Sequence, residues 1–288
     1  MDLSFTDVAN PLTRTGGYLA GVTSHSLQPY RGCPLGSSLC GVGCYVQHNP
    51  WLTRGRRWGS FLEIRQSTAQ AYLSHAPRER RWAHRKGSRF SIFLASSTEP
   101  FPPQERRYGV TAALLEAMLV EPPDELVVQT HSAAVTDHRG SLLELSRRCR
   151  LRVHVSIESD RETLPGLPPP GSPVARRFDA ARTLHEAGLE TVITVAPLLP
   201  LLDAETFFRR AAASAGALVL DHFVGGDGTP DGRRTHRTAL PAAMEAVEPG
   251  SSSPEYLERV LEIARRVFPG PIGVGADGFA ARYRAGAA

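Results

Sequence analysis

Short apolar segments alternate with amphipathic segments along most of the chain. Apolar runs typical of buried strands cover residues 27–30, 89–96, 125–132, 151–159, 191–198 and 217–223. Segments with helical periodicity cover roughly residues 60–75 and then 104–120, 141–149, 174–188, 203–216 and 254–268. Strands that alternate with helices in this way predict βαβ units, a parallel sheet and right-handed crossovers.

The six predicted β/α units indicate an α/β fold, a partial or full (β/α)6 barrel with parallel strands rather than two separate domains. We divide the chain into an N-terminal extension (1–22), a barrel core (23–225) and a C-terminal part (226–288). The loop, helix and tail of this last part are expected to close the barrel. In such folds the active site lies on the loops that follow the strands.

Composition fits a globular chain. Of its 288 residues 41% are hydrophobic, which is enough to bury a sizeable core. No apolar stretch approaches the roughly 20 residues of a membrane helix, and the N-terminus lacks the pattern of a signal peptide. We therefore expect a soluble cytoplasmic protein without a membrane partner. In that compartment four cysteines favour metal binding or catalysis over a disulfide framework.

Three of the four cysteines lie within twelve residues, directly after the first predicted strand. Cys33, Cys40 and Cys44 are separated by gaps of six and three residues. Structural zinc sites are closed by four ligands, so zinc at this loop would need His25 or His48. An iron–sulfur cluster closed by the protein takes four cysteines, whereas three leave one iron open to an external ligand.

The fourth cysteine lies far from this loop. Cys149 is on a predicted helix, where we interpret it as a small buried apolar side chain. Three clustered thiols on the first loop of a barrel therefore favour a cluster with one open iron, while a zinc-bound loop stays the alternative.

Positive charge is concentrated in one segment. Between residues 51 and 90 there are ten Arg or Lys against two Glu, and all three tryptophans of the chain lie there. Basic side chains among aromatic ones can bind a phosphate backbone and stack on bases, so residues 54–89 are a candidate surface for DNA or RNA. The alternative interpretation is a solvated helix face.

The cysteine loop resembles radical S-adenosylmethionine (SAM) enzymes, in the branch of spore photoproduct lyase. That branch carries a segment like N-P-Y-x-G-C-x-x-x-C-x-Y-C-Y. In HSLQPYRGC…CGVGCY the matching positions are Pro29, Tyr30, Gly32, Cys33, Cys44 and Tyr45. The departures are Gln28 in place of asparagine, Gly43 in place of an aromatic residue, and the CX6CX3C spacing.

Four further segments resemble strand ends of the same family. ASSTEPFPPQERR (95–107) is similar to its second-strand motif, with Glu99 for aspartate, and QTHS (129–132) has His131 in place of a lysine. VHVSIES (153–159) and VITVAPLLPLLD (192–203) resemble its fourth and fifth strands. The resemblance assigns SAM contacts to Tyr45, Ser97, Thr98, Glu99, His131, Ser156, Glu158 and Ala196.

The resemblance implies a fold of the radical SAM type, a partial (β/α)6 barrel. It also implies a 4Fe-4S cluster held by Cys33, Cys40 and Cys44, whose open iron binds SAM. The reduced cluster would cleave SAM to a 5′-deoxyadenosyl radical that abstracts hydrogen from the substrate. A low-potential electron donor such as a flavodoxin or ferredoxin is the implied partner.

The substrate is not identified by the resemblance. A nucleic acid or nucleotide is the candidate class, because spore photoproduct lyase acts on DNA and residues 54–89 are basic. Asp221 and His222, at the end of the sixth predicted strand, are the candidate substrate contacts. A nucleic-acid-binding protein with a zinc- or cluster-stabilised loop and no radical chemistry is the alternative. The sequence does not indicate the oligomeric state.

Overall fold

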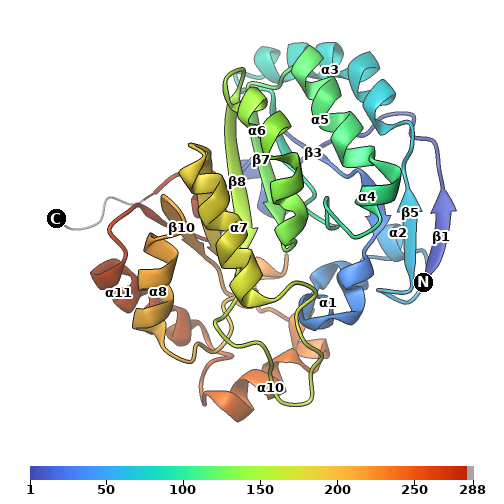
Figure 1. Ribbon diagram of the computed structural model, residues 1–288. Coiled ribbons are helices and arrows are strands. Elements are labelled where there is room, and N and C mark those ends of the chain that lie inside the picture. The colour runs from blue at the N-terminus through green and yellow to red at the C-terminus, as the bar shows by residue number, and fades with distance from the viewer. Residues whose placement is uncertain (284–288) are drawn as a thin grey trace.

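The computed structural model describes residues 1–283 and is built around one eight-stranded sheet (Figure 1). Its strand order is β11-β10-β9-β8-β7-β6-β3-β2. The strands are β2 Leu12–Arg14, β3 His25–Leu27, β6 Ser91–Leu94, β7 Glu125–Thr130, β8 Arg150–Ser156, β9 Glu190–Val195, β10 Ala217–Leu220 and β11 Ile272–Val274. All neighbours pair in parallel except β2, which is antiparallel to β3.

This sheet confirms the predicted α/β fold and partial barrel. The six predicted units correspond to β3 and β6 to β10, in the order of the chain. Two strands that the pattern did not predict extend the sheet, since β11 comes from the predicted C-terminal tail and β2 from the predicted N-terminal extension. The order is linear, so within residues 1–283 the barrel stays open between β2 and β11.

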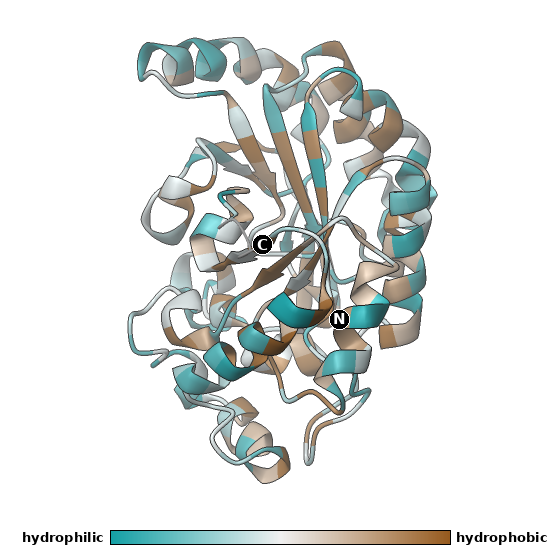
Figure 2. Cartoon of the chain, turned by 90° about the vertical axis from the view of Figure 1, so that its left-hand side faces the viewer, coloured by the Kyte–Doolittle hydropathy of each residue, from teal (hydrophilic) through white to brown (hydrophobic). Residues whose placement is uncertain are grey.

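Helices cover the outer face of the sheet, as Figure 1 shows. They are α3 Thr68–Arg85, α5 Val110–Val120, α6 Arg139–Ser146, α7 Val174–Glu186, α8 Ala204–Ala212 and α11 Pro254–Val267. Because side chains alternate along a strand, Val128 and Val153 face this helical layer and join the main hydrophobic core. Hydrophobic strands run through the centre of the molecule in Figure 2, and the exposed helix faces are hydrophilic.

The opposite alternation lines the inside of the barrel. Val127, Val192 and Val219 form a second apolar cluster with Phe279. Phe279 comes from α12 (Gly275–Phe279), so the last described helix covers part of the barrel interior. The C-terminal part of the chain therefore covers part of the inner face of the sheet. Residues 284–288 of the predicted C-terminal part lie outside the described residues.

Two predicted elements near the cysteines are wrong. The first barrel strand is β3, not residues 27–30, because the chain leaves the sheet at Pro29, which has no N–H to donate. Residues 60–75 are not one helix: Phe61–Ile64 is strand β5, and α3 begins at Thr68 and runs to Arg85. All four residues of β5 are buried between two neighbouring strands, so tertiary packing overrides the helical pattern.

Those two neighbours form a small second sheet with β5. Its order is β1-β5-β4, with β1 at Asp2–Phe5 and β4 at Tyr30–Gly32. It lies at the right edge of Figure 1, beside the N-terminus. The strand that leads into the first cysteine thus belongs to this small sheet, and Tyr30, Leu62 and Ile64 pack together on one of its faces.

Short elements connect these layers. Helix 104–120 is in fact two helices, α4 Glu105–Tyr108 and α5, because Gly109 adopts φ +60° between them. The predicted loop 225–237 begins with α9 Phe223–Gly226 and ends with the turn η5 Thr235–Arg237, and α10 Leu240–Val247 follows. The other short elements are η1 Gly17–Gly21, η2 Pro34–Ser37, α1 Leu39–Gly43, η3 Tyr45–His48, α2 Pro50–Thr53 and η4 Ala133–His138.

Candidate functional site

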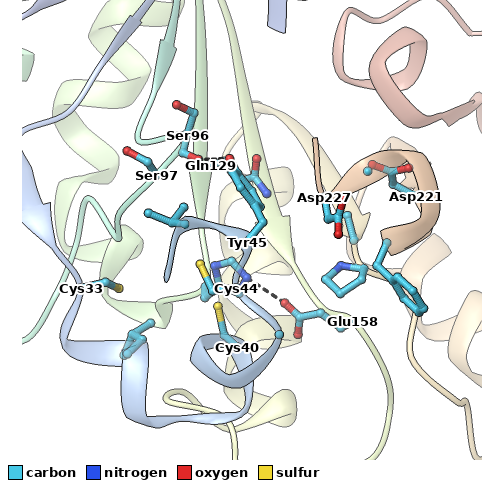
Figure 3. A pocket seen from close by; sticks show the side chains of 18 of the residues that line it. Cys33, Cys40, Cys44, Tyr45, Ser96, Ser97, Gln129, Glu158, Asp221 and Asp227 are labelled. Carbon is cyan, nitrogen blue, oxygen red and sulfur yellow. Dashed lines mark hydrogen bonds and ion pairs between the residues drawn. The ribbon is translucent and has the colours of Figure 1, made fainter. Parts of the chain in front are cut away.

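A pocket of about 240 Å³ lies where the parallel strands end (Figure 3). The residues that follow β6 to β10 line it, and so do the thiols of Cys33, Cys40 and Cys44. In Figure 3 the cysteines lie on one side, Asp221 and Asp227 lie on the other, and Glu158 stands between them. The C-terminal edge of a parallel sheet is where ligands bind in folds of this kind.

Glycines hold the cysteine loop in its compact shape. A Cβ on Gly41 would lie 2.1 Å from the carbonyl oxygen of Gly36, and a Cβ on Gly36 would lie 2.4 Å from the amide nitrogen of Gly59. Gly32, just before Cys33, has φ +80° and faces the Phe61 carbonyl as closely. The long CX6CX3C loop therefore folds with backbone against backbone, which brings three distant thiols to one pocket.

The thiols stand in a site that disfavours free thiolates. Burial raises the pKa of Cys33, with Cys40 and Cys44 adding to the effect. Burial together with Cys40 raises the pKa of Cys44 to about 12. Buried thiolates close to one another need a bound cation, and a coordinating metal deprotonates thiols outright. The donor set therefore fits a metal cofactor.

The thiols are not gathered at the spacing of a single ion. In the part of the chain that the structure describes, no three Cys, His, Asp or Glu side chains converge on a mononuclear metal position. A cluster of four irons is larger than one ion and is held by thiolates that stand farther apart. The three thiols on one pocket wall are compatible with that larger group.

A buried charge network lies beside the thiols. Glu158, after β8, pairs with Arg177 of α7 at 2.6 Å and with Nε2 of His131 at 2.9 Å. Burial opposes ionisation of Glu158, but Arg177 and His131 together hold its pKa well below the usual range. Burial alone would lower the pKa of His131, yet Cys40 and Glu158 raise it well above its ordinary value. The network thus favours the charged forms of Glu158 and His131 inside the pocket.

Glu99 is fixed by several donors. Its carboxylate accepts the hydroxyl of Thr130 at 2.5 Å and the backbone N–H groups of His131 (2.8 Å) and Phe101 (3.0 Å). Burial nevertheless raises its pKa. Glu99 therefore ties the end of β6 to the end of β7 at the pocket wall.

The other predicted SAM contacts are mostly in the same place. Ser97, Thr98 and Ala196 line the pocket, as does Tyr45, whose hydroxyl donates to the Ser96 carbonyl at 2.8 Å. Ser156 is the exception, because it is buried below the wall and its hydroxyl accepts from Gln129 at 3.2 Å. Their roles toward SAM stay predictions.

Asp221 and His222 line the far side of the pocket. The hydroxyl of Tyr18 donates to Asp221 at 2.7 Å. Burial raises the pKa of Asp221 to about 6, although this hydrogen bond opposes the shift. His222 is held by its own contacts, since its Nδ1 accepts the Val224 amide at 3.1 Å and its pKa is lowered by burial.

Several lining residues were not predicted. Tyr18 and Phe279 come from the two ends of the chain, and Arg177 and Trp58 come from positions that resemble no motif. Gln129 lies in the QTHS segment but was not itself predicted as a contact. The inward alternation of β7 would have indicated Gln129, since it is two residues from Val127. The sequence carries no comparable signal for Tyr18 or Phe279, because only the tertiary fold brings them to the pocket.

Some cations of the basic segment 54–89 form ion pairs and others do not. Arg56 pairs with Glu63, Arg78 with Glu79, and Arg80 with Glu121. Trp82 packs under Arg14 and Trp58 lines the pocket, which leaves Trp51 as the exposed tryptophan, at 85%. Across residues 1–283 no helix is long and apolar enough to cross a membrane.

Structures of spore photoproduct lyase are similar to this chain. A mutant with dinucleoside spore photoproduct has a TM-score of 0.64 at 14% identity, and a mutant with bound AdoMet (SAM) and dinucleoside spore photoproduct has 0.60 at 15%. Each likeness covers 95% of this chain and 81% of the lyase chain. No protein-family model and no curated protein matches the sequence. The predicted fold is thus confirmed, and the chain has the fold of spore photoproduct lyase.

Proposed function

We propose that this chain is a radical SAM enzyme that acts on a nucleic acid or nucleotide. The observation that carries the proposal is the convergence of three thiols from one loop on a pocket at the C-terminal ends of the barrel strands. The fold shared with spore photoproduct lyase supports it, and the dinucleoside and AdoMet in one lyase structure support the class of substrate and cofactor.

Cys33, Cys40 and Cys44 would hold a 4Fe-4S cluster with one iron open to SAM. When bound and reduced, this cofactor pair supplies a 5′-deoxyadenosyl radical that abstracts a hydrogen atom. The protein's own work is to bind, orient and exclude water. The fold holds the Glu158 carboxylate and His131 imidazolium as opposite charges beside the thiols, which suits the charged amino and carboxylate groups of SAM.

The remaining roles follow from position. Glu99, Ser97 and Thr98 after β6, Tyr45 beside Ser96, and Ala196 after β9 are the proposed SAM contacts. Ser156 would act through Gln129, which its hydroxyl contacts. Asp221 and His222, on the wall opposite the cysteines, would face the substrate.

A low-potential flavodoxin or ferredoxin is the proposed electron donor, because the proposed cluster would have a low reduction potential and would need an external reductant. Four free cysteines in residues 1–283 fit a reducing compartment, so we place the enzyme in the cytoplasm.

Anaerobic purification with iron and sulfide analysis tests the proposal. We expect about four irons per chain after reconstitution, and 5′-deoxyadenosine after addition of dithionite and SAM. A colourless protein that binds one zinc would instead support the alternative, a nucleic-acid-binding protein without radical chemistry.

Single substitutions localise the cluster. Cys33→Ala, Cys40→Ala and Cys44→Ala should each abolish iron binding, because a three-thiolate site has no spare ligand. Cys149→Ala is the matched control, since this half-buried thiol donates to the Leu145 carbonyl on α6 and lies outside the pocket. Retention of four irons in all three loop variants would contradict the proposal.

A further inference from the structure

A second hollow lies outside the pocket, between the small sheet and the N-terminal segment. Arg31, Arg54 and Arg65 line it together with residues 6–10. Arg54 and Arg65 belong to the basic segment 54–89 that the sequence indicated as a candidate nucleic-acid surface, whereas Arg31 lies outside it. The proposed chemistry in the main pocket uses none of the three.

The small sheet places two of these arginines on one face. Arg31 of β4 is paired in register with Glu63 of β5, and Arg65 follows Glu63 by two residues. Side chains two apart on a strand share a face, so Arg31, Glu63 and Arg65 point to the same side, away from the apolar cluster around Tyr30. The strand register of the small sheet thus places the guanidinium groups of Arg31 and Arg65 on the same face.

These charges are not balanced. Glu63 is buried and shared between Arg31 and Arg56, which hold its pKa below the ordinary value despite burial. Asp7 is the acid among the residues that line the hollow, and it is exposed. The lining therefore carries three guanidinium groups and one carboxylate.

Arg65 has no carboxylate partner within residues 1–283. One of its nitrogens donates to the Gln28 carbonyl at 2.5 Å, which fixes the guanidinium in place. Burial and the neighbouring Arg31 lower its pKa to about 10, so Arg65 stays a cation at neutral pH but is repelled by Arg31. An external anion would relieve this repulsion, and the planar guanidinium matches phosphate oxygens in bidentate geometry.

Two features connect the hollow with the main pocket. Cys33 follows Arg31 by two residues, and the side chain of Gln28 donates to Ser96 at 2.8 Å and accepts from the Ser97 amide, both at the pocket wall. Trp51 is 85% exposed on α2, which packs against β4 and ends at Thr53, directly before Arg54. An exposed indole one helical turn from Arg54 offers a stacking surface for a base.

We propose that Arg31, Arg54 and Arg65 form a phosphate site that binds a backbone phosphodiester of a single-stranded nucleic acid whose neighbouring nucleotide enters the cysteine-lined pocket. The inference rests on the proposed function for the class of substrate. Of the predicted nucleic-acid surface at residues 54–89, this inference retains only the part beside the small sheet, at Arg54 and Arg65.

The test uses the anaerobically purified full-length chain and a fluorescein-labelled single-stranded oligothymidylate, with anisotropy measured over a salt series. Arg54→Ala should weaken binding severalfold and reduce the slope of log affinity against log salt by about 0.7, the loss of one phosphate contact. The matched control is Arg85→Ala, because Arg85 is also an exposed arginine at a helix end, on α3, and forms no ion pair within residues 1–283. Equal effects of the two variants would overturn the proposal.

Arg65→Lys keeps the charge and removes the bidentate fork, so it should weaken oligonucleotide binding with its thermal unfolding midpoint kept near that of the wild type. Binding of inorganic phosphate, followed by ³¹P NMR, separates the two sources of this chemistry. If Arg54→Ala abolishes phosphate binding and leaves oligonucleotide binding intact, the hollow is a free-anion site and the proposal fails.

Failure of this inference is distinguishable from failure of the proposed function. A protein that loads iron and forms 5′-deoxyadenosine, yet binds oligonucleotide equally well with and without Arg54, contradicts the phosphate site alone. A protein that binds no iron, yet shows the Arg54-dependent salt slope, contradicts the radical chemistry and keeps the phosphate site.

Discussion

The cysteine-lined pocket and the arginine hollow differ in how their charged side chains are paired. Beside the cysteines, Glu158 is buried and matched by Arg177 and His131. At the hollow, Arg65 and Arg54 have no carboxylate partner within residues 1–283. A buried, matched network holds its own geometry, whereas unmatched cations near the surface are available to an external anion. The paired charges around Glu158 therefore serve to hold the pocket in shape, whereas the unpaired arginines at the hollow can bind a ligand.

The largest expected effect comes from breaking the matched network. Arg177→Met leaves the Glu158 carboxylate buried with half its partners, which should lower the free energy of unfolding by about 3–5 kcal/mol. Urea denaturation measures this. Arg176→Met is the control, since Arg176 is the exposed neighbour on the same helix. A similar loss of unfolding free energy in both variants would mean that the Arg177–Glu158 pair contributes no more to stability than an exposed arginine does.

Asp221 is an acid on the pocket wall without a cationic partner in the described chain. Its pKa is about 6 when folded, against an ordinary 3.8, so the folded protein holds a proton that the unfolded chain releases between these pH values. Stability from this group therefore falls as pH rises through that window. Asp221→Asn removes this titration. The unfolding free energy of the variant relative to wild type should therefore rise by up to about 3 kcal/mol between about pH 4 and pH 7.

Urea midpoints at the two pH values measure that gain. Tyr18→Phe removes the hydrogen bond that lowers the pKa of Asp221, so it should shift the window toward higher pH. A constant difference between Asp221→Asn and wild type at both pH values would contradict the assignment.

The glycine-packed loop that separates the two regions gives a third test. Gly41→Ala places a methyl group 2.1 Å from the Gly36 carbonyl, which should cost about 1–3 kcal/mol of stability and reduce iron loading. Gly140→Ala on α6 is the control, because its added Cβ meets nothing within 4 Å and alanine favours a helix. Full iron loading in Gly41→Ala would show that the loop tolerates expansion.

The smallest effect is expected at the surface. Trp51→Ala should leave the unfolding midpoint unchanged, because the indole is 85% exposed. It should weaken oligonucleotide binding by about 1 kcal/mol through lost stacking. Leu202→Ala, at another exposed apolar side chain, should change neither quantity. An unaltered affinity in Trp51→Ala would restrict the contact to the arginines.

Local patterns explain which parts of this molecule are predictable. The parallel strands follow from alternating apolar runs, and the residues after them reach the pocket because strand ends share one edge. The small sheet does not follow, since Phe61–Ile64 has a pattern compatible with either a helix or a strand until β1 and β4 pair with it.

The same limit applies to the site. The cysteine spacing indicates a loop that does line the pocket, while Arg177 and Tyr18 reach the pocket through contacts that no local pattern encodes. The basic segment reads as one surface in the sequence, but in the fold Glu63 pairs with Arg56 and Glu79 with Arg78, so its cations are not equally available to a ligand.

The contact between Tyr18 and Asp221 joins residues 203 positions apart, and the Tyr18 ring also packs edge-on against Phe279. Closing so long a loop carries an entropic cost that neighbouring βα units do not face, so we expect this wall to be completed late in folding. On the ribosome the cysteine loop emerges long before Phe279. In a nascent chain the three thiols would thus be present before the Tyr18–Asp221 wall is complete, which would leave that side of the pocket open to an incoming metallocofactor.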